Sequence, residues 1–188
     1  LLKDIFPQNA VDMGMLKAGG FLHRQFVKKE KKLYALSDTI GCMSQANVDF
    51  ILKHNPEIAA QKVEINPNSI QPVEMVFSQE EKNAIREKYN LPLDKNIFVY
   101  GGNLGKPQGV DFLIETIKEN INPIAFFLVV GNGTEYLRIK KWFEENQPKN
   151  AVLYNKLPKQ DYDKLLAACD VGMLFLDKQF TIPNFPSR

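Results

Sequence analysis

The second half of this 188-residue sequence predicts a doubly wound α/β fold, in which helices cover both faces of a parallel sheet. From residue 96 onward, short apolar runs alternate with longer amphipathic stretches. The runs are apolar throughout rather than alternately apolar and polar, which is typical of parallel strands buried on both faces. Glycine-bearing loops follow the first two runs. Right-handed crossovers between such strands place the helices on both sides of the sheet.

Each apolar run or amphipathic stretch of this half corresponds to one expected element. Strands are expected at 97–100, 125–130, 151–154 and 171–176, and helices at 110–120, 135–146 and 160–169. Residues at helical spacing are expected to face the core: Phe112, Leu113 and Ile117 in the first helix, and Leu137, Ile139 and Trp142 or Phe143 in the second.

The first part of the chain is less regular. It predicts helices at 17–36 and 45–54, the second capped by Ser44, and strands at 39–43 and 62–65. A turn cluster at 66–69 and an aperiodic stretch to residue 77 indicate a domain boundary, so we divide the chain into 1–70 and 71–188. A linking helix over 78–89 starts with a capping-box pair, Ser78 and Glu81.

Composition and charge exclude several classes of function. A net charge of +2 in an ordinary globular composition gives no reason to expect a nucleic-acid partner. No apolar stretch approaches the roughly 20 residues that span a bilayer. Cys42 and Cys169 lie in apolar runs without metal-site or disulfide spacing, so we expect reduced core cysteines in a cytoplasmic protein. No cofactor or metal is expected.

The candidate binding residues lie in loops that follow the strands, because ligands of doubly wound sheets bind beyond the carboxyl ends of the strands. In the loop 101–109, glycines allow close backbone approach, the following helix start suits phosphate, and Lys106 adds a charge. The alternative is a plain strand-to-helix turn. In the loop 155–159, which follows the third expected strand, Leu157 could lie against a base. Tyr162, in the helix after this loop, could equally pack in the core. The candidate ligand-binding residues of these loops are Gly102, Asn103, Leu104, Gly105, Lys106, Gly131, Gly133 and Leu157.

Four segments, taken together, resemble the retaining GT-B glycosyltransferases of the group 1, or family 4, type, which includes bacterial capsule and O-antigen enzymes. The segments are 102–109, 130–135, 168–172 and 185–188. The resemblance implies that 1–70 is the later part of an N-terminal, acceptor-side Rossmann-like domain and that 71–188 is a truncated donor domain. It also implies that Arg188 begins a sugar-binding segment. We therefore expect the chain to be part of a longer protein.

The implied reaction is transfer of a hexosyl or N-acetylhexosaminyl group from a nucleoside diphosphate sugar, with retention, to a glycan acceptor that is lipid-linked. Many members carry an Arg where Asn103 stands and a Lys near Gln108, so Lys106 is left as the phosphate cation of the first loop. The segment that would carry the family's two glutamates is not present, so no catalytic residue is assigned. His23 and His54 match no family position and are expected on the surface.

Other interpretations remain open at this stage. The same architecture serves sugar-nucleotide epimerases and non-enzymatic nucleotide-binding α/β domains. Residues 17–34 also have two interpretations, because their aromatic and aliphatic residues are interleaved with lysines. They form either a core-packed helix with a solvated lysine face, or a surface helix that gives the protein peripheral contact with anionic lipid at the membrane.

Overall fold

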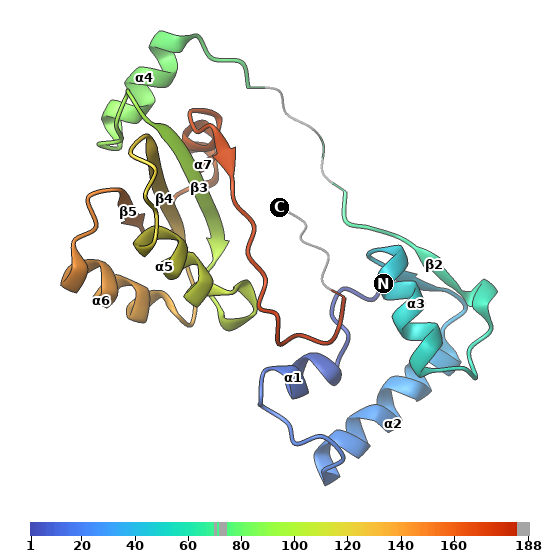
Figure 1. Ribbon diagram of the computed structural model, residues 1–188. Coiled ribbons are helices and arrows are strands. Elements are labelled where there is room, and N and C mark those ends of the chain that lie inside the picture. The colour runs from blue at the N-terminus through green and yellow to red at the C-terminus, as the bar shows by residue number, and fades with distance from the viewer. Residues whose placement is uncertain (70, 72–74, 184–188) are drawn as a thin grey trace. The chain divides into compact units, whose positions relative to one another are not determined.

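The computed structural model describes residues 1–69, 71 and 75–183, and the chain divides into two compact units (Figure 1). The first unit comprises residues 1–71 and 178–188, and the second comprises 72–177. The sequence-based boundary at residue 70 lies close to the first crossing between the units. The sequence alone assigned residues 178–188 to the donor domain, whereas their described part packs with the first unit: the Thr181 hydroxyl bonds Asp12, and Ile182 is buried.

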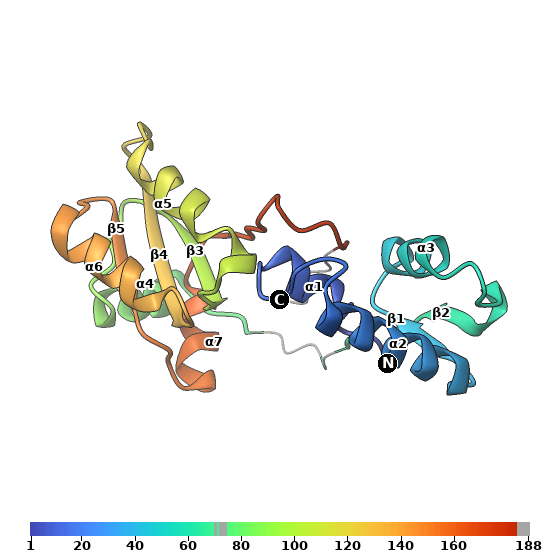
Figure 2. The ribbon, with the colours of Figure 1, turned by 90° about the horizontal axis from the view of Figure 1, so that it is seen from below.

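The first unit is built around a small parallel sheet of β1 (Ile40–Cys42) and β2 (Val63–Ile65), which Figure 2 shows beside its helices. The sequence predicted both strands and both longer helices. Ser44 caps the second of them as expected, because its hydroxyl accepts a hydrogen bond from the Asn47 N–H. The helices and turns of this unit are α1 (Gln8–Asp12), α2 (Phe21–Leu36), α3 (Gln45–His54) and the 3₁₀ turn η1 (Ala60–Lys62).

Helix α2 buries only one of its faces. Tyr34 enters the core and Phe26 is half-buried, whereas Phe21, Leu22 and Leu33 are exposed. The core that covers Tyr34 includes Ile5, Ile40, Cys42, Val48, Ile51, Val63 and Ile182. The apolar residues of the 17–34 segment are therefore divided between the core and the solvent.

The histidines were expected on the surface, and the cysteines were expected to be reduced core residues. His54 is exposed as expected, whereas His23 is half-buried. Both line a small cavity beside Glu30. Cys42 is buried and free, and burial raises the pKa of its thiol. In the second unit Cys169 is also free, and burial raises the pKa of its thiol to about 12. Both cysteines are thus protonated at neutral pH.

The second unit is the predicted doubly wound layer. Its strands are all parallel, in the order β5-β4-β3-β6. The strands are β3 (Asn96–Asn103), β4 (Ala125–Asn132), β5 (Ala151–Tyr154) and β6 (Val171–Gly172); the helices are α4 (Gln79–Lys88), α5 (Val110–Lys118), α6 (Tyr136–Asn146) and α7 (Lys159–Ala167), with a 3₁₀ turn η2 (Lys106–Gln108).

Alternate residues of the central strands enter two different cores. Tyr100 of β3 belongs to the cluster that contains Leu113 of α5 and Ile139 of α6. Its neighbour Val99 belongs to the cluster that contains Leu165 of α7. This alternation is the strand period of two, and it explains why the runs are apolar throughout: each face of the sheet is covered by a pair of helices, α5 and α6 on one and α4 and α7 on the other.

Some boundaries and facings differ from the expectations. β3 continues through Gly101, Gly102 and Asn103, because each pairs in register with a residue of β4. β6 is only two residues long, since the chain then leaves β3 and Asp177 N–H bonds the Pro107 carbonyl in η2. Leu137 is 77% exposed and Phe112 is 60% exposed, so neither faces the core as predicted.

An ion pair between the buried Arg86 and the partly exposed Asp170 fixes α4 to the start of the sheet. The Arg86 guanidinium donates to both oxygens of Asp170, at 3.0 and 2.8 Å. It also donates to the carbonyls of Ala168 and Lys95. Asp170 in turn accepts from the Ile97 N–H at 2.6 Å, at the amino end of β3. The 168–172 motif therefore contributes a structural carboxylate rather than a ligand-facing one.

Candidate functional site

A pocket of about 460 Å³ lies at the carboxyl ends of β3, β4 and β5. This is the edge at which parallel α/β sheets bind their ligands. Its volume is within the range of small-molecule sites. Nine described residues from the ends of β3 and β4, the loop after β5 and α7 line it: Gly102, Asn103, Val130, Gly131, Asn132, Lys156, Leu157, Lys159 and Tyr162.

Glycines let the walls of this pocket come close together. Gly131 and Gly102 are register partners on adjacent strands, and a Cβ on Gly131 would overlap the Gly102 carbonyl oxygen. Gly102 itself has φ of 132°, a conformation that favours glycine. Gly101 leaves room for the Tyr162 phenol, which lies where a Cβ on Gly101 would be. Tyr162 of α7 therefore closes the pocket over the end of β3.

An amide pair joins the loops that follow β4 and β5. The Asn132 side chain donates to the Asn155 Oδ1 at 2.8 Å and accepts from the Gly133 N–H at 2.7 Å. Asn155 Oδ1 also accepts from the Lys156 N–H. This network holds the backbone of Lys156 against the end of β4, so the loop after β5 forms a defined wall of the pocket.

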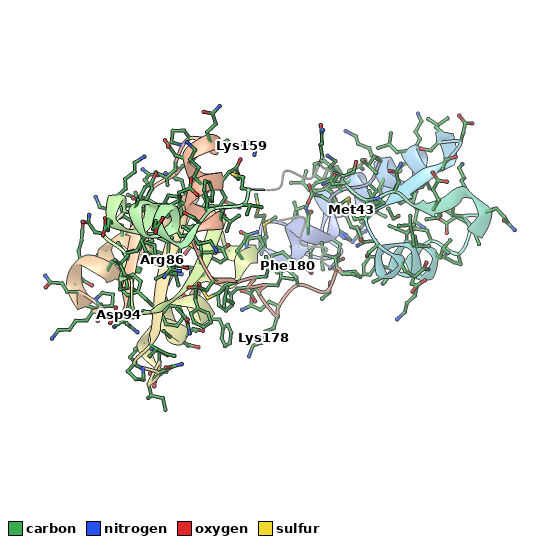
Figure 3. The ribbon with its side chains drawn as sticks, turned by 90° about the horizontal axis from the view of Figure 1, so that it is seen from above. Met43, Arg86, Asp94, Lys159, Lys178 and Phe180 are labelled. Carbon is green, nitrogen blue, oxygen red and sulfur yellow. The ribbon has the colours of Figure 1, made fainter. Side chains whose placement is uncertain are left out.

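Two lysines supply the positive charge of the pocket. Lys156 follows β5, and Lys159 begins α7 (labelled in Figure 3). Lys159 forms an exposed ion pair with Asp163. Lys156 makes no ion pair with any residue that the structure describes, so its charge is available to an anionic ligand.

The structure brings together four of the sequence-predicted site residues: Gly102, Asn103, Gly131 and Leu157 all line the pocket. Four others lie elsewhere. Leu104 is fully buried in the core, and its backbone bonds Asn132 and Glu135. Gly105 is buried under Gln108, and Lys106 is an exposed residue of η2. Gly133 packs against the Leu104 carbonyl. Arg188 is outside the described residues.

Sequence reasoning did not assign five of the residues that line the pocket: Val130, Asn132, Lys156, Lys159 and Tyr162. Lys156 and Lys159 could have been nominated, because both stand in the loop that follows a predicted strand. Asn132 offered a similar signal, since it follows the predicted end of β4. Tyr162 had no such signal, because its contact with Gly101 depends on how α7 packs across the sheet.

Residues 81–175 match the family described as Glycosyl transferases group 1. The chain belongs to this family. It is 25% identical over 190 residues to the probable glycosyltransferase WbjE of Pseudomonas aeruginosa, covering 100% of this chain and 46% of that protein. It is 31% identical over 90 residues to WcaI of Escherichia coli K12, a putative colanic acid biosynthesis glycosyl transferase, covering 48% of this chain and 21% of that protein.

Solved structures identify the fold as GT-B. WaaG, a glycosyltransferase involved in lipopolysaccharide biosynthesis, aligns over 92% of this chain and 48% of its own, with a TM-score of 0.61 and 16% identity. Anabaena Alr3699/HepE, crystallised with UDP and glucose, aligns over 79% of this chain and 42% of its own, with a TM-score of 0.59 and 14% identity. The chain thus spans less than half the length of each of these proteins. Among the described residues, no helix has the length and apolarity to cross a bilayer.

Proposed function

We propose that this chain carries the donor-nucleotide site of a glycosyltransferase that uses a nucleoside diphosphate sugar. The enzyme transfers the sugar with retention, as a hexosyl or N-acetylhexosaminyl group, to a lipid-linked glycan in cell-surface polysaccharide biosynthesis. The observation that carries the proposal is the pocket that the ends of β3 and β4 and the loop after β5 form around Gly102, Gly131 and Lys156. Family membership supports sugar transfer, and the HepE complex with UDP and glucose supports this donor class.

The chemistry of the pocket suits a leaving diphosphate. In sugar transfer the bond between the anomeric carbon and the diphosphate breaks, so negative charge develops on the diphosphate oxygens. A cation placed beside that charge lowers the barrier electrostatically. Two lysines line the described part of this pocket. Lys156 has no carboxylate partner among the described residues, and Lys159 pairs with Asp163. The base then lies along Leu157, and Gly102 and Gly131 let the backbone approach the phosphates.

Replacing Lys156 distinguishes this proposal from the sequence-based choice of Lys106. We expect Lys156→Gln to weaken UDP, GDP or ADP binding, whichever the parent chain prefers, by about 1–3 kcal/mol, the scale of a charged hydrogen bond. Lys159→Gln should have a smaller effect, because Asp163 already neutralises part of its charge. Isothermal titration with the three nucleotides measures these changes.

Lys106→Gln is the matched control, since it removes the same charge from an exposed residue outside the pocket lining. Its affinity should stay within about twofold of the parent, which is about 0.4 kcal/mol. A loss in Lys106→Gln with no loss in Lys156→Gln would return the phosphate role to the first loop. Absence of binding by the parent chain to all three nucleotides would count against the donor-site proposal itself.

We further propose that α2 gives the enzyme peripheral contact with an anionic membrane, as a lipid-linked acceptor requires. Three exposed leucines, Leu22, Leu33 and Leu36, fall on one stripe of the helix at helical spacing. Lys29 is exposed on this stripe, and Lys32 is exposed beside it. Exposed apolar residues flanked by lysines are typical of helices that lie in the interface of an anionic bilayer.

Vesicle co-sedimentation at low and high salt tests this contact. The parent chain should sediment with phosphatidylserine-containing vesicles at low salt and be released at high salt. A Lys29→Gln, Lys32→Gln double variant should bind about thirtyfold more weakly, since each lysine near the surface contributes about 1 kcal/mol and the two together about 2 kcal/mol. The control Lys140→Gln, Lys141→Gln carries the same charge change on α6 and should bind as the parent does. Equal loss in both double variants would point to net charge instead of α2.

A further inference from the structure

A second cavity, of about 520 Å³, lies in the same unit as the nucleotide pocket but at the other edge of the sheet. It borders Lys95, which precedes β3, the carboxyl-terminal ends of α5 and α6, and the loops that lead into β4 and β5. The nucleotide pocket borders the carboxyl ends of the same strands. In Figure 3, Asp94, which adjoins Lys95, lies well apart from Lys159 of the nucleotide pocket. The two cavities are therefore separate sites.

Trp142 of α6 provides an apolar wall of this second cavity. Its indole is half-buried against the core and meets the Phe143 ring edge-on, with centroids 5.3 Å apart. These contacts fix the ring, so binding need not order it. A rigid aromatic surface at the side of a cavity stacks well against the C–H face of a pyranose ring.

Asparagine side chains provide oriented hydrogen-bonding groups around Trp142. The Asn146 amide nitrogen donates to the Trp142 carbonyl at 2.8 Å, and that of Asn150 donates to the Ile117 carbonyl at 3.1 Å. These bonds hold both amides in place. Their side-chain oxygens accept no hydrogen bond from the described residues, which leaves them as acceptors for hydroxyl groups.

The cavity is positively charged. Lys95, Lys118 and Lys149 line it, and none of its described lining residues is an Asp or Glu. Lys118 lies 3.6 Å from Glu119 and is partly neutralised. Lys95 and Lys149 form no ion pair with any described residue. Two available ammonium groups beside an aromatic wall and amide acceptors suit a ligand that is both anionic and rich in hydroxyls.

We propose that this cavity binds an acidic saccharide, such as a stretch of uronate-containing glycan, independently of the donor nucleotide. The lysines disfavour a neutral sugar as the preferred ligand, because their charge would be left without a partner. The indole and the two amide acceptors disfavour a simple inorganic anion, which has no C–H face or hydroxyl for them to bind. Such a site would keep an acidic glycan on the enzyme at a distance from the donor.

Trp142 is the single tryptophan of the chain, so its fluorescence reports on this cavity directly. Tetragalacturonate added to the 188-residue chain at low salt should change the emission saturably. Maltotetraose, the neutral counterpart, and inorganic pyrophosphate should bind at least about tenfold more weakly. Lys95→Gln and Lys149→Gln should each weaken tetragalacturonate binding by about fivefold, as expected when a charge-assisted contact is lost.

Lys141→Gln is the matched control, because Lys141 adjoins Trp142 but does not line the cavity and pairs with Glu145 on the helix surface. It should bind tetragalacturonate as the parent does, and all three variants should retain the parent's far-ultraviolet circular dichroism. An unchanged emission with tetragalacturonate, an equal response to maltotetraose or pyrophosphate, or an equal loss in Lys141→Gln would each overturn the proposal. Nucleotide titrations test the donor site separately, so failure of one proposal leaves the other standing.

Discussion

Asp170→Asn should lower the free energy of unfolding of the second unit by about 2–3 kcal/mol. Removing one partner of a fully buried ion pair costs about 3–5 kcal/mol, because the remaining charge is left buried without compensation. The Arg86 side chain is only 6% exposed, but that of Asp170 is 40% exposed, so water can partly replace the carboxylate and reduces the loss. The substitution also places an amide N–H₂ where the guanidinium or the Ile97 N–H donates.

Asp161→Asn is the control for this loss. Asp161 of α7 pairs with Lys88 of α4 at 3.6 Å, and both side chains are largely exposed, at 43% and 64%. Exposed pairs of this kind contribute about 0–1 kcal/mol. Urea unfolding followed by the fluorescence of Trp142 measures the second unit alone, because that residue belongs to it. Equal midpoints for the two variants would mean that the Arg86 pair does not hold α4 to the sheet.

The Arg86 pair also shows where sequence reasoning stops. Periodicity correctly placed α4 and the capping box of Ser78 and Glu81, since both depend on residues a few positions apart. Arg86 is a charged residue in a polar helix, and its partner stands 84 residues further along the chain. Its burial depends on α4 meeting the start of β3, which local spacing does not encode.

The strand ends illustrate a related limit. Glycine is a weak strand former, so the sequence suggested that β3 ends before Gly101. In the fold, Gly101 and Gly102 remain in the strand because pairing with β4 and close packing compensate for the low propensity. The apolar run at 171–176 led to too long a prediction for β6, which ends at Gly172. The chain then leaves the sheet, and Asp177 bonds the Pro107 carbonyl of η2. Buried parallel pairing, rather than propensity, decided both boundaries.

The candidate site was predicted in outline because its position follows from topology. Strand-end loops of a parallel sheet meet at one edge, and Gly102, Gly131 and Leu157 come together there. Which side chain of a loop turns into the pocket depends on tertiary packing, which local sequence does not reveal. Leu104 appeared to be a loop residue but is fully buried in the core, and Lys106 lies outside the pocket lining. The amide pair of Asn132 and Asn155 presents Lys156 instead.

Gly131→Ala should both destabilise the second unit and remove nucleotide binding. The added Cβ would overlap the Gly102 carbonyl oxygen, a backbone atom of the adjacent strand that cannot rotate away. The two strands must therefore separate at the pocket. Overpacking of this kind costs about 1–3 kcal/mol. Since both glycines line the pocket, we expect nucleotide affinity to fall by more than about tenfold, or 1.4 kcal/mol.

Gly172→Ala provides the comparison, because it adds the same methyl group to a strand of the same sheet where no atom lies within 4 Å of the new Cβ. Its stability should change by no more than about 0.5 kcal/mol, the usual range for substitutions that create no clash. Its nucleotide affinity should match that of the parent chain. Urea unfolding and calorimetric titration of both variants separate the two effects. If Gly131→Ala unfolds at the parent's midpoint and still binds nucleotide with the parent's affinity, the close approach of β3 and β4 does not shape this pocket. If it unfolds early yet binds normally, the glycine pair stabilises the sheet without contributing to the ligand site.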